Sequence, residues 1–287
     1  MEHAKTITVI LPNYNYANYL PQRIKEVIDQ TYPVNEIVIL DDASTDDSVE
    51  VINKLVAKIK YGMPNLTIKT DFNKNNSGNV FSQWQKGIKL ASSEYIWIAE
   101  LDDKNKPAFL GTVIQGFNDP QTVLSYCNSK YINDNGKLVI KDSLRKIKDL
   151  LRRRHATKDY NVSGMTELNR NLAVYNSIPN VSAVVFKNLP NLVNILDESK
   201  QYQLSGDWIF YIELAKKGKI AYSHETLNQH RIHSDSVSSS VNLKQRYHEM
   251  ITIHNKLKNT PGIKNDTIQR MDKIEQTLKN NWSIEND

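Results

Sequence analysis

The sequence predicts an α/β protein with a mostly parallel central sheet and helices on both of its faces. In the first half of the chain, short apolar runs alternate with helical hydrophobic patterns, which is typical of parallel strands joined by crossover helices. Two of the apolar runs end in clusters of carboxylates, at Asp41-Asp42 and from Glu100 to Asp103. The 287 residues suffice for one large domain, with or without an appendage.

Four apolar runs of the first half are expected to form strands, because β-branched and aromatic residues favour strands. These runs occupy residues 6–11, 36–40, 66–70 and 95–99. Helices are expected between them, at residues 19–30, at residues 48–59 after a capping sequence, and at residues 79–91. A further helix at residues 107–117 precedes another strand at residues 123–126.

The second half of the chain is less regular. Asn135-Gly136 is typical of a hairpin turn, so a hairpin is expected over residues 131–140. Strands are expected at residues 181–186, 220–222 and 226–232, and a helix at residues 208–217 that ends before Gly218. Two amphipathic helices, at residues 243–257 and 267–278, are expected to pack on the domain or on a partner. We therefore expect one α/β domain over residues 1–240 and a helical extension over residues 241–287.

Composition excludes several classes of protein. The lone Cys127 excludes an intrachain disulfide and a cysteine metal cluster. No apolar stretch reaches the roughly 18 residues of a membrane span, and the N-terminus lacks the apolar segment of a signal peptide. We therefore expect a cytoplasmic protein.

The acidic sequence Glu100-Leu101-Asp102-Asp103 is the strongest functional signal. Its three carboxylates, at the end of a buried strand, repel one another and lose hydration. A cation is expected to neutralise them, and oxygen ligands of this kind suit Mg²⁺ or Mn²⁺ that holds a substrate phosphate. The alternative is a helix N-terminus, where the acids interact with the helix dipole and Pro107 opens the helix.

Two other polar motifs are expected at the same edge of the sheet, because ligands of open α/β sheets bind at the carboxyl ends of the strands. Pro12-Asn13-Tyr14-Asn15 follows the first strand, and Asp41-Asp42 follows the second. Carboxylates at this edge could accept hydrogen bonds from a pyrimidine N–H or from ribose hydroxyls, which suits Asp41 or Asp42 and Glu100. Turns and helix caps use the same residue types, but three such motifs at one edge favour a nucleotide site.

In their order along the chain, these motifs resemble those of the family 2 glycosyltransferases with the GT-A fold. The resemblance extends over about residues 5–240. Each segment is a weak signal alone, whereas the ordered set is specific. The other matching segments are Gln30-Thr31-Tyr32-Pro33, Glu36 to Asp46, Asn76-Ser77-Gly78-Asn79, Gly206-Asp207-Trp208 and His230 to Ser238.

The resemblance implies a Rossmann-like GT-A domain with a nucleotide-sugar half over about residues 1–130 and an acceptor half over about residues 131–240. It also implies a metal-dependent, inverting enzyme of the hexosyltransferase class. Such an enzyme moves a sugar from a nucleotide diphosphate, with a UDP-sugar favoured, to an acceptor hydroxyl. The implied nucleotide contacts are Pro12, Tyr14, Asn15, Asp41, Asp42, Asn76, Gly78, Glu100 and Asp102. The implied ligands of Mn²⁺ or Mg²⁺ are Asp102, Asp103 and His233, and the implied diphosphate contacts are Arg231 and His233.

The resemblance also implies that Asp207 is the general base. An acidic pair usually supplies the base in the family, but Gly206 replaces the first acid here. A helix dipole favours the charged form of a carboxylate at the N-terminus, so we expect Asp207 to be ionised and weakly basic. A helix cap before Trp208 is the alternative role of Asp207. His230 stands where the family usually has tyrosine.

Three other functions share part of this pattern. A sugar nucleotidyltransferase also uses strand-end acids and a metal, but it usually has a glycine-rich basic loop where this chain has residues 12–16. A phosphoacceptor signalling domain is about half as long and needs acids after the first strand. An inactive nucleotide- or glycan-binding module on the same fold would not need Asp102, Asp103, Asp207 and His233 together.

The segment from Arg145 to His155 concentrates the positive charge of a chain whose net charge is +5. It is basic and amphipathic, so we expect peripheral contact with the inner face of the cell membrane. Such contact suits a glycan or lipid-linked acceptor in cell-surface polysaccharide synthesis. The rival is that these charges flank the active site and hold a soluble or phosphorylated acceptor. No nucleic-acid partner is expected, and the C-terminal helices are expected to allow self-association.

Overall fold

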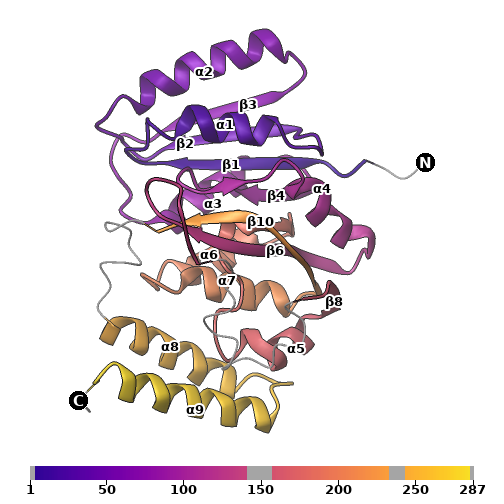
Figure 1. Ribbon diagram of the computed structural model, residues 1–287, viewed down its shortest axis with the longest axis vertical. Coiled ribbons are helices and arrows are strands. Elements are labelled where there is room, and N and C mark those ends of the chain that lie inside the picture. Colours follow the sequence, from indigo (N-terminus) through magenta and orange to yellow (C-terminus); the bar gives the residue numbers. More distant parts are fainter. Residues whose placement is uncertain (1–3, 141–156, 233–242, 285–287) are drawn as a thin grey trace.

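The computed structural model describes residues 4–140, 157–232 and 243–284. Its centre is a ten-stranded sheet in the order β3-β2-β1-β4-β9-β6-β10-β5, with β7 paired to β6 and β8 paired to β10 (Figure 1). The strands are β1 (Ile7–Asn13), β2 (Glu36–Asp41), β3 (Thr67–Phe72), β4 (Tyr95–Ile98), β5 (Lys104–Asn105), β6 (Thr122–Ile132), β7 (Leu138–Ile140), β8 (Tyr160–Ser163), β9 (Val184–Lys187) and β10 (Lys219–Arg231).

The directions of the strands bring many of their carboxyl ends to one edge of the sheet. β1 is parallel to β2 and β4, β2 is parallel to β3, and β6 is parallel to β10. β9 is antiparallel to both β4 and β6, so the two parallel groups run in the same direction. The short strands β5, β7 and β8 add antiparallel pairs. This arrangement confirms the predicted α/β class.

Helices cover both faces of the sheet, because successive side chains of its central strands point to opposite faces. Val9 and Trp97 belong to one core with residues of α1, α2 and α4. Ile10 and Ile98 belong to a second core with residues of α3, α6 and α7. The helices are α1 (Leu20–Ile28), α2 (Ser48–Gly62), α3 (Val80–Leu90), α4 (Phe109–Val113), α5 (Gly164–Glu167), α6 (Leu192–Ser199), α7 (Gly206–Ala215), α8 (Leu243–Lys258) and α9 (Asn265–Asn281).

The C-terminal helices pack on the domain, which is one of the two expected arrangements. Figure 1 shows α8 and α9 side by side next to the layer that contains α7. Met250, Ile253 and Leu257 of α8 and Met271 and Ile274 of α9 join the same core as the side chains of α7. The two helices therefore share their apolar face with the α/β domain. None of the described helices is long and apolar enough to cross a membrane.

Three predicted elements differ from the structure in type or in continuity. The strand predicted at residues 181–186 begins as a 3-10 turn at Val181–Ala183, because Ser182 turns to accept hydrogen bonds from Trp97 and Asn105 through its carbonyl. The two strands predicted at residues 220–232 are one strand, β10, with a bulge between Ser223 and Thr226. The helix predicted at residues 107–117 is α4 followed by a 3-10 turn, Ile114–Asn118.

The predicted hairpin is present, with Gly136 at a φ of 73° and its N–H bonded to the Asn133 carbonyl at 2.8 Å. The helix predicted at residues 208–217 is α7, which begins two residues earlier. The basic segment from Arg145 to His155 lies outside the described residues, as does His233.

Candidate active site

The predicted site residues of the first four strands meet at one edge of the sheet. Asn13 at the end of β1 lies opposite Asp41 at the end of β2. Ile98 at the end of β4 lies opposite Ile10, so the acidic sequence that follows it reaches the same edge. Arg231 at the end of β10 joins them through a hydrogen bond from its backbone N–H to Asp103 Oδ1, at 2.9 Å.

Asp41 and the motif after β1 hold two loops together. Asn13 Nδ2 donates to Asp41 Oδ2 at 2.6 Å, and Asp41 is buried. Asn15 adopts a left-handed conformation and accepts a hydrogen bond from Thr45 N at 2.7 Å through its side chain. Pro12 is buried within β1, whereas Tyr14 is 45% exposed at the edge. Of the residues predicted here, Tyr14 and Asn15 are exposed, whereas Pro12 and Asp41 are buried.

Asp42 organises the loop between β3 and α3. Its carboxylate accepts four hydrogen bonds, and the donors belong to Asn73, Ser77 and Gln83. Further along the loop, the exposed Asn76 accepts a hydrogen bond from the N–H of Gly78, which has a φ of 65°. Residues that carry a side chain rarely adopt that backbone conformation, which explains the glycine at this position. Asp42 therefore shapes the loop that carries the predicted contacts Asn76 and Gly78.

The three acids of the acidic sequence differ in their surroundings. Asp103 is buried and accepts hydrogen bonds from Asn180 Nδ2 at 2.6 Å and from the backbone of Arg231. Glu100 is partly exposed and accepts a hydrogen bond from Trp84 Nε1 at 2.9 Å. Burial raises the pKa of Glu100 to about 8, and the charge of Asp102 acts in the same direction. A cation at this edge would offset the burial and the mutual repulsion that raise the pKa values of Glu100 and Asp103.

Two arginines lie around the acids. Arg23 is fully buried over the Trp97 ring, and the charges of Asp103 and Asp102 oppose the lowering of the Arg23 pKa by burial. Arg231 donates through Nε to the Asp102 carbonyl at 2.7 Å. Its Nη1 donates to the carbonyls of Asn133 and Asp134, both at 2.8 Å. Arg231 thus ties the acidic loop to the β6–β7 turn, and its predicted contact with a diphosphate stays a prediction.

The donor set suits a divalent cation that a substrate helps to hold. Within the described ranges, no three His, Cys, Asp or Glu side chains gather to bind a metal. Asp102 is partly exposed, whereas Asp103 is engaged by Asn180 and Arg231. Mg²⁺ is commonly bound by one or two carboxylates together with substrate phosphates. Asp102 therefore fits this role better than Asp103.

Asp207 lies in the first turn of α7, where two neighbours orient it. Its carboxylate accepts hydrogen bonds from Trp208 N at 2.7 Å and from Asn176 Nδ2 at 3.0 Å. Burial raises the pKa of Asp207 to about 6, although these hydrogen bonds and the charges of Arg246 and His230 act in the opposite direction. Desolvation thus outweighs the helix terminus, and the Asp207 carboxylate is more basic than the helix-dipole argument predicts, although a pKa of about 6 leaves it ionised at neutral pH.

Gly206 occupies a position that has no room for a side chain. A Cβ atom there would lie 2.4 Å from the Phe81 ring and 2.5 Å from the Ser199 carbonyl oxygen. The acid that the family usually has at this position therefore does not fit between Phe81 and α6. Asp207 is left as the carboxylate at the start of α7.

A family model assigns the chain to a family. The model described as glycosyl transferase family 2 matches residues 8–175, more than half of the chain. The chain belongs to the family 2 glycosyltransferases. An uncharacterised glycosyltransferase of Nostoc, alr2836, is 35% identical over 134 residues, or 46% of this chain and 39% of that protein. Chondroitin synthase of Pasteurella multocida is 29% identical over 135 residues, or 46% of this chain and 13% of the synthase.

Solved structures share the fold of this family 2 chain. The S. aureus TarS 1–349 structure in complex with UDP-GlcNAc has a TM-score of 0.69 and 17% identity, and it covers 96% of this chain and 73% of the TarS chain. The mannosyltransferase PcManGT from Pyrobaculum calidifontis, in complex with GDP-Man and Mn²⁺, has a TM-score of 0.64 and 14% identity. That match covers 96% of this chain and 70% of PcManGT. These likenesses confirm the GT-A fold.

The prediction from the sequence did not include several residues of this family 2 site. Asn176, Asn180 and Ser182 contact Asp207, Asp103 and the Glu100 backbone, respectively. Asn176 and Asn180 come from an irregular segment without hydrophobic periodicity, so no pattern marked them, and Ser182 stood inside the strand predicted at residues 181–186. Tyr16 follows the first motif directly, and burial together with the charges of the three acids raises its pKa. His230 packs against the Tyr131 ring, and its buried Nδ1 has no hydrogen-bond partner among the described residues.

Proposed function

We propose that the protein transfers a sugar from a nucleotide diphosphate, with a UDP-sugar favoured, to an acceptor hydroxyl with inversion at the anomeric carbon. The observation that carries this proposal is that the acidic residues 100–103 and Asp207 lie close to the same surrounding side chains. Trp84 donates to Glu100 and packs edge-on against Phe210 of α7. Asn176 and Asn180 of one short segment donate to Asp207 and Asp103, respectively. In this proposal, α7 and the ends of β4 and β10 bring the donor site and the general base together.

In this proposal Asp207 takes the proton of the acceptor hydroxyl. The acceptor oxygen forms a bond to the anomeric carbon, while the bond from that carbon to the diphosphate oxygen breaks on the opposite face. Glu100 and the Asp41-Asp42 loops hold the nucleoside, and Asp102 with the nucleotide phosphates would hold Mn²⁺ or Mg²⁺. When bound, the metal supplies positive charge that stabilises the diphosphate leaving group. The UDP-GlcNAc and the GDP-Man with Mn²⁺ in structures of the same fold support this reading.

The first test is calorimetric titration of UDP with and without Mn²⁺. We expect UDP binding that weakens at least about tenfold in chelator or in Asp102→Asn, because removal of the charged ligand removes the metal. Asp29→Asn, at the exposed residue that follows α1, is the matched control. Equal UDP affinity in all samples would contradict the donor site. Release of UDP from a UDP-sugar, and not of pyrophosphate, separates a glycosyltransferase from a nucleotidyltransferase.

We also propose a glycan or lipid-linked acceptor at an anionic membrane. Two facts support this: the basic segment from Arg145 to His155, and the likeness to a chondroitin synthase. We expect flotation with vesicles of anionic lipid at low salt and not with neutral vesicles, because each basic residue near such a surface contributes about 1 kcal/mol. Absence from both kinds of vesicle would favour a soluble or phosphorylated acceptor.

A further inference from the structure

The C-terminal helices α8 and α9 contact the segments on both sides of Asp207, although they lie beyond residues 8–175 that the family model matches. We propose that this helical hairpin positions the base, with Glu249 and His254 of α8 as positioning residues that act through the backbone around Asp207. The inference rests on the proposed role of Asp207 and extends it to helices that lie beyond the residues that the family model matches.

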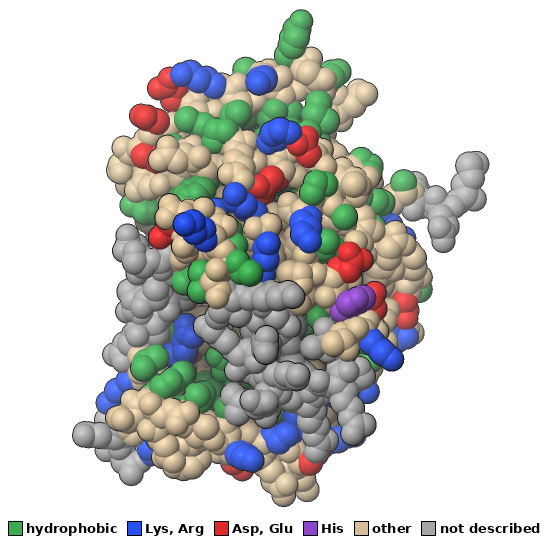
Figure 2. Space-filling model, in the orientation of Figure 1, with side chains coloured by type: hydrophobic (Ala, Val, Ile, Leu, Met, Phe, Trp, Pro, Cys, Tyr) green, Lys and Arg blue, Asp and Glu red, His purple; other side chains and the backbone are tan. Residues whose placement is uncertain are grey.

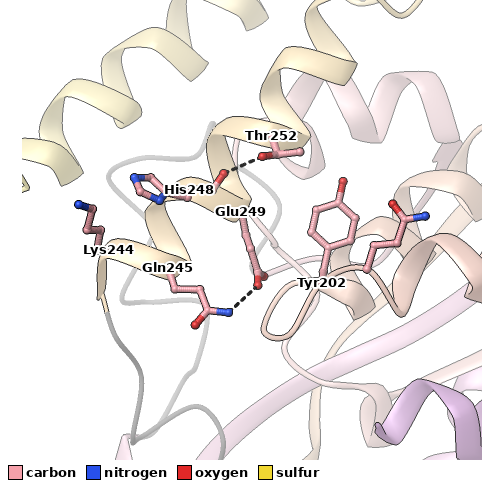
Figure 3. Close-up of a pocket in the computed structure, with 7 residues that line it drawn as sticks. Tyr202, Lys244, Gln245, His248, Glu249 and Thr252 are labelled. Atoms are coloured by element: carbon pink, nitrogen blue, oxygen red, sulfur yellow. Dashed lines mark hydrogen bonds between the residues drawn. The ribbon is translucent and has the colours of Figure 1, made fainter. Parts of the chain in front are cut away.

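Glu249 holds the loop that leads into α7. Its carboxylate accepts hydrogen bonds from Gln203 N at 2.9 Å and from Leu204 N at 3.1 Å. Gln245, one turn earlier, donates to Gln203 Oε1 at 2.6 Å. Figure 3 shows Glu249 pointing from α8 toward the segment that carries Tyr202. Because α7 begins at Gly206, these bonds fix the backbone immediately before Asp207.

His254 contacts two further segments near Asp207: the one before Asn176, and Trp208, which follows Asp207. The ring is fully buried, with Nε2 3.1 Å from the Val174 carbonyl and Nδ1 2.7 Å from Glu275 Oε1 of α9. Val174 lies two residues before Asn176, which donates to Asp207. The His254 ring also packs edge-on against the Trp208 ring, with centroids 5.8 Å apart. One side chain of α8 thus contacts the residue that follows Asp207 and the segment that carries its hydrogen-bond donor.

Ion pairs and buried side chains fix α8 against α6 and α7. Lys256 of α8 binds Glu198 Oε2 of α6 at 2.6 Å and Glu213 Oε1 of α7 at 3.1 Å. Ile253 and Leu257 on the same helix are fully buried in the core that includes α7. A displacement of α8 would therefore move the start of α7, and with it Asp207.

The charges near Asp207 come from three elements. Arg246 of α8 and His230 of β10 favour its ionised form, and Tyr211 of α7 lies close enough to experience its charge. Desolvation by the surrounding protein has the opposite and larger effect. A shift of the backbone that exposes Asp207 should therefore lower its pKa toward the ordinary value of an aspartate.

Glu249→Ala is the test variant, and Glu249→Gln is its conservative partner, because an amide oxygen can still accept from the loop N–H groups. An open cavity of about 380 Å³ is lined by Glu249, Tyr202 and Gln245, so truncation of Glu249 does not bury a void. Asp272→Ala is the matched control, since it breaks the Lys258–Asp272 ion pair inside the hairpin and touches no residue near Asp207.

The assay is turnover of UDP-GlcNAc, or of whichever nucleotide sugar a donor screen selects, measured between pH 4.5 and 8. We expect Glu249→Ala to lower kcat about 10–100-fold with unchanged donor KM, and to move the pH inflection below that of the wild type. Glu249→Gln should recover most of kcat, and Asp272→Ala should match the wild type. His254→Gln, at equal folded fraction by circular dichroism, should lower kcat in the same way.

The inference would be overturned if Glu249→Ala and His254→Gln had the same kcat and the same pH inflection as the control Asp272→Ala. Asp207→Asn separates this failure from a failure of the proposed base. If Asp207→Asn is inactive while Glu249→Ala and His254→Gln are normal, the base stands and the positioning role does not. If Asp207→Asn retains turnover, the proposed base itself is wrong, and the positioning role falls with it.

Discussion

At the scale of single residues, the environment of Asp207 makes its reactivity dependent on pH. Burial raises its pKa to about 6, and it accepts a proton only when it is ionised. We therefore expect kcat to rise as pH increases through about 6 and to level off above it. Asp207→Asn should reduce transfer about 10²–10⁴-fold and retain UDP affinity, because a positioned base contributes a factor of that size. Turnover and UDP titration of the two proteins measure both effects.

Asp197→Asn provides a control at an exposed aspartate of α6 whose pKa is lowered by hydrogen bonds from Gln85 and Lys200. This variant should keep both the rate and its pH dependence. Near-normal transfer in Asp207→Asn would support the helix-cap role of this residue instead.

At the scale of elements, the contact between α3, α6 and α7 leaves Gly206 without space for a methyl group. The nearest atoms to a new Cβ are the Phe81 ring and a backbone carbonyl of α6, which cannot move without shifting the helix. We expect Gly206→Ala to lower the free energy of unfolding by about 1–3 kcal/mol, the usual effect of overpacking. Urea denaturation measures this change.

Gly62→Ala at the end of α2 is the control, because no atom lies within 4 Å of the Cβ that it adds. An equal decrease in the free energy of unfolding in both variants would contradict the argument that close packing at Gly206 leaves no room for a second acid.

The central elements were predictable because their local pattern and their environment agree. β1 and β2 are buried throughout, so their continuous apolar sequences identify them. The polar motifs at their ends, Asn13-Tyr14-Asn15 and Asp41-Asp42, were placed at the correct edge of the sheet for the same reason. Asn176 and Asn180 could not be found in this way, since they act through side chains carried by irregular backbone. The direction of the Asp207 pKa shift also depended on burial by distant segments, which a local helix-dipole argument omits.

At the scale of the whole molecule, α8 and the sheet share one core, so they should unfold together. Ile253 is fully buried in that core. We expect Ile253→Ala to lower the free energy of unfolding by about 2–5 kcal/mol and to preserve a single transition. Tryptophan fluorescence and far-ultraviolet circular dichroism, followed in the same urea series, measure both properties.

Val49→Ala on α2 is the control, because Val49 is 40% exposed. Two separate transitions would instead identify α8 and α9 as an independent unit. The amphipathic pattern of α8 and α9 indicated that their apolar faces are buried. Only the folded chain identifies α6 and α7 as the elements that bury them.

The four hydrogen bonds that converge on Asp42 have a consequence for the kinetics of nucleotide binding. They order the loop between β3 and α3 while the chain folds, so the entropy of ordering that loop is lost before a ligand arrives. Association should then depend on diffusion, charge and orientation, with no slow rearrangement of this loop. Nucleotides that differ in their contacts with the loop would therefore differ mainly in how long they stay bound.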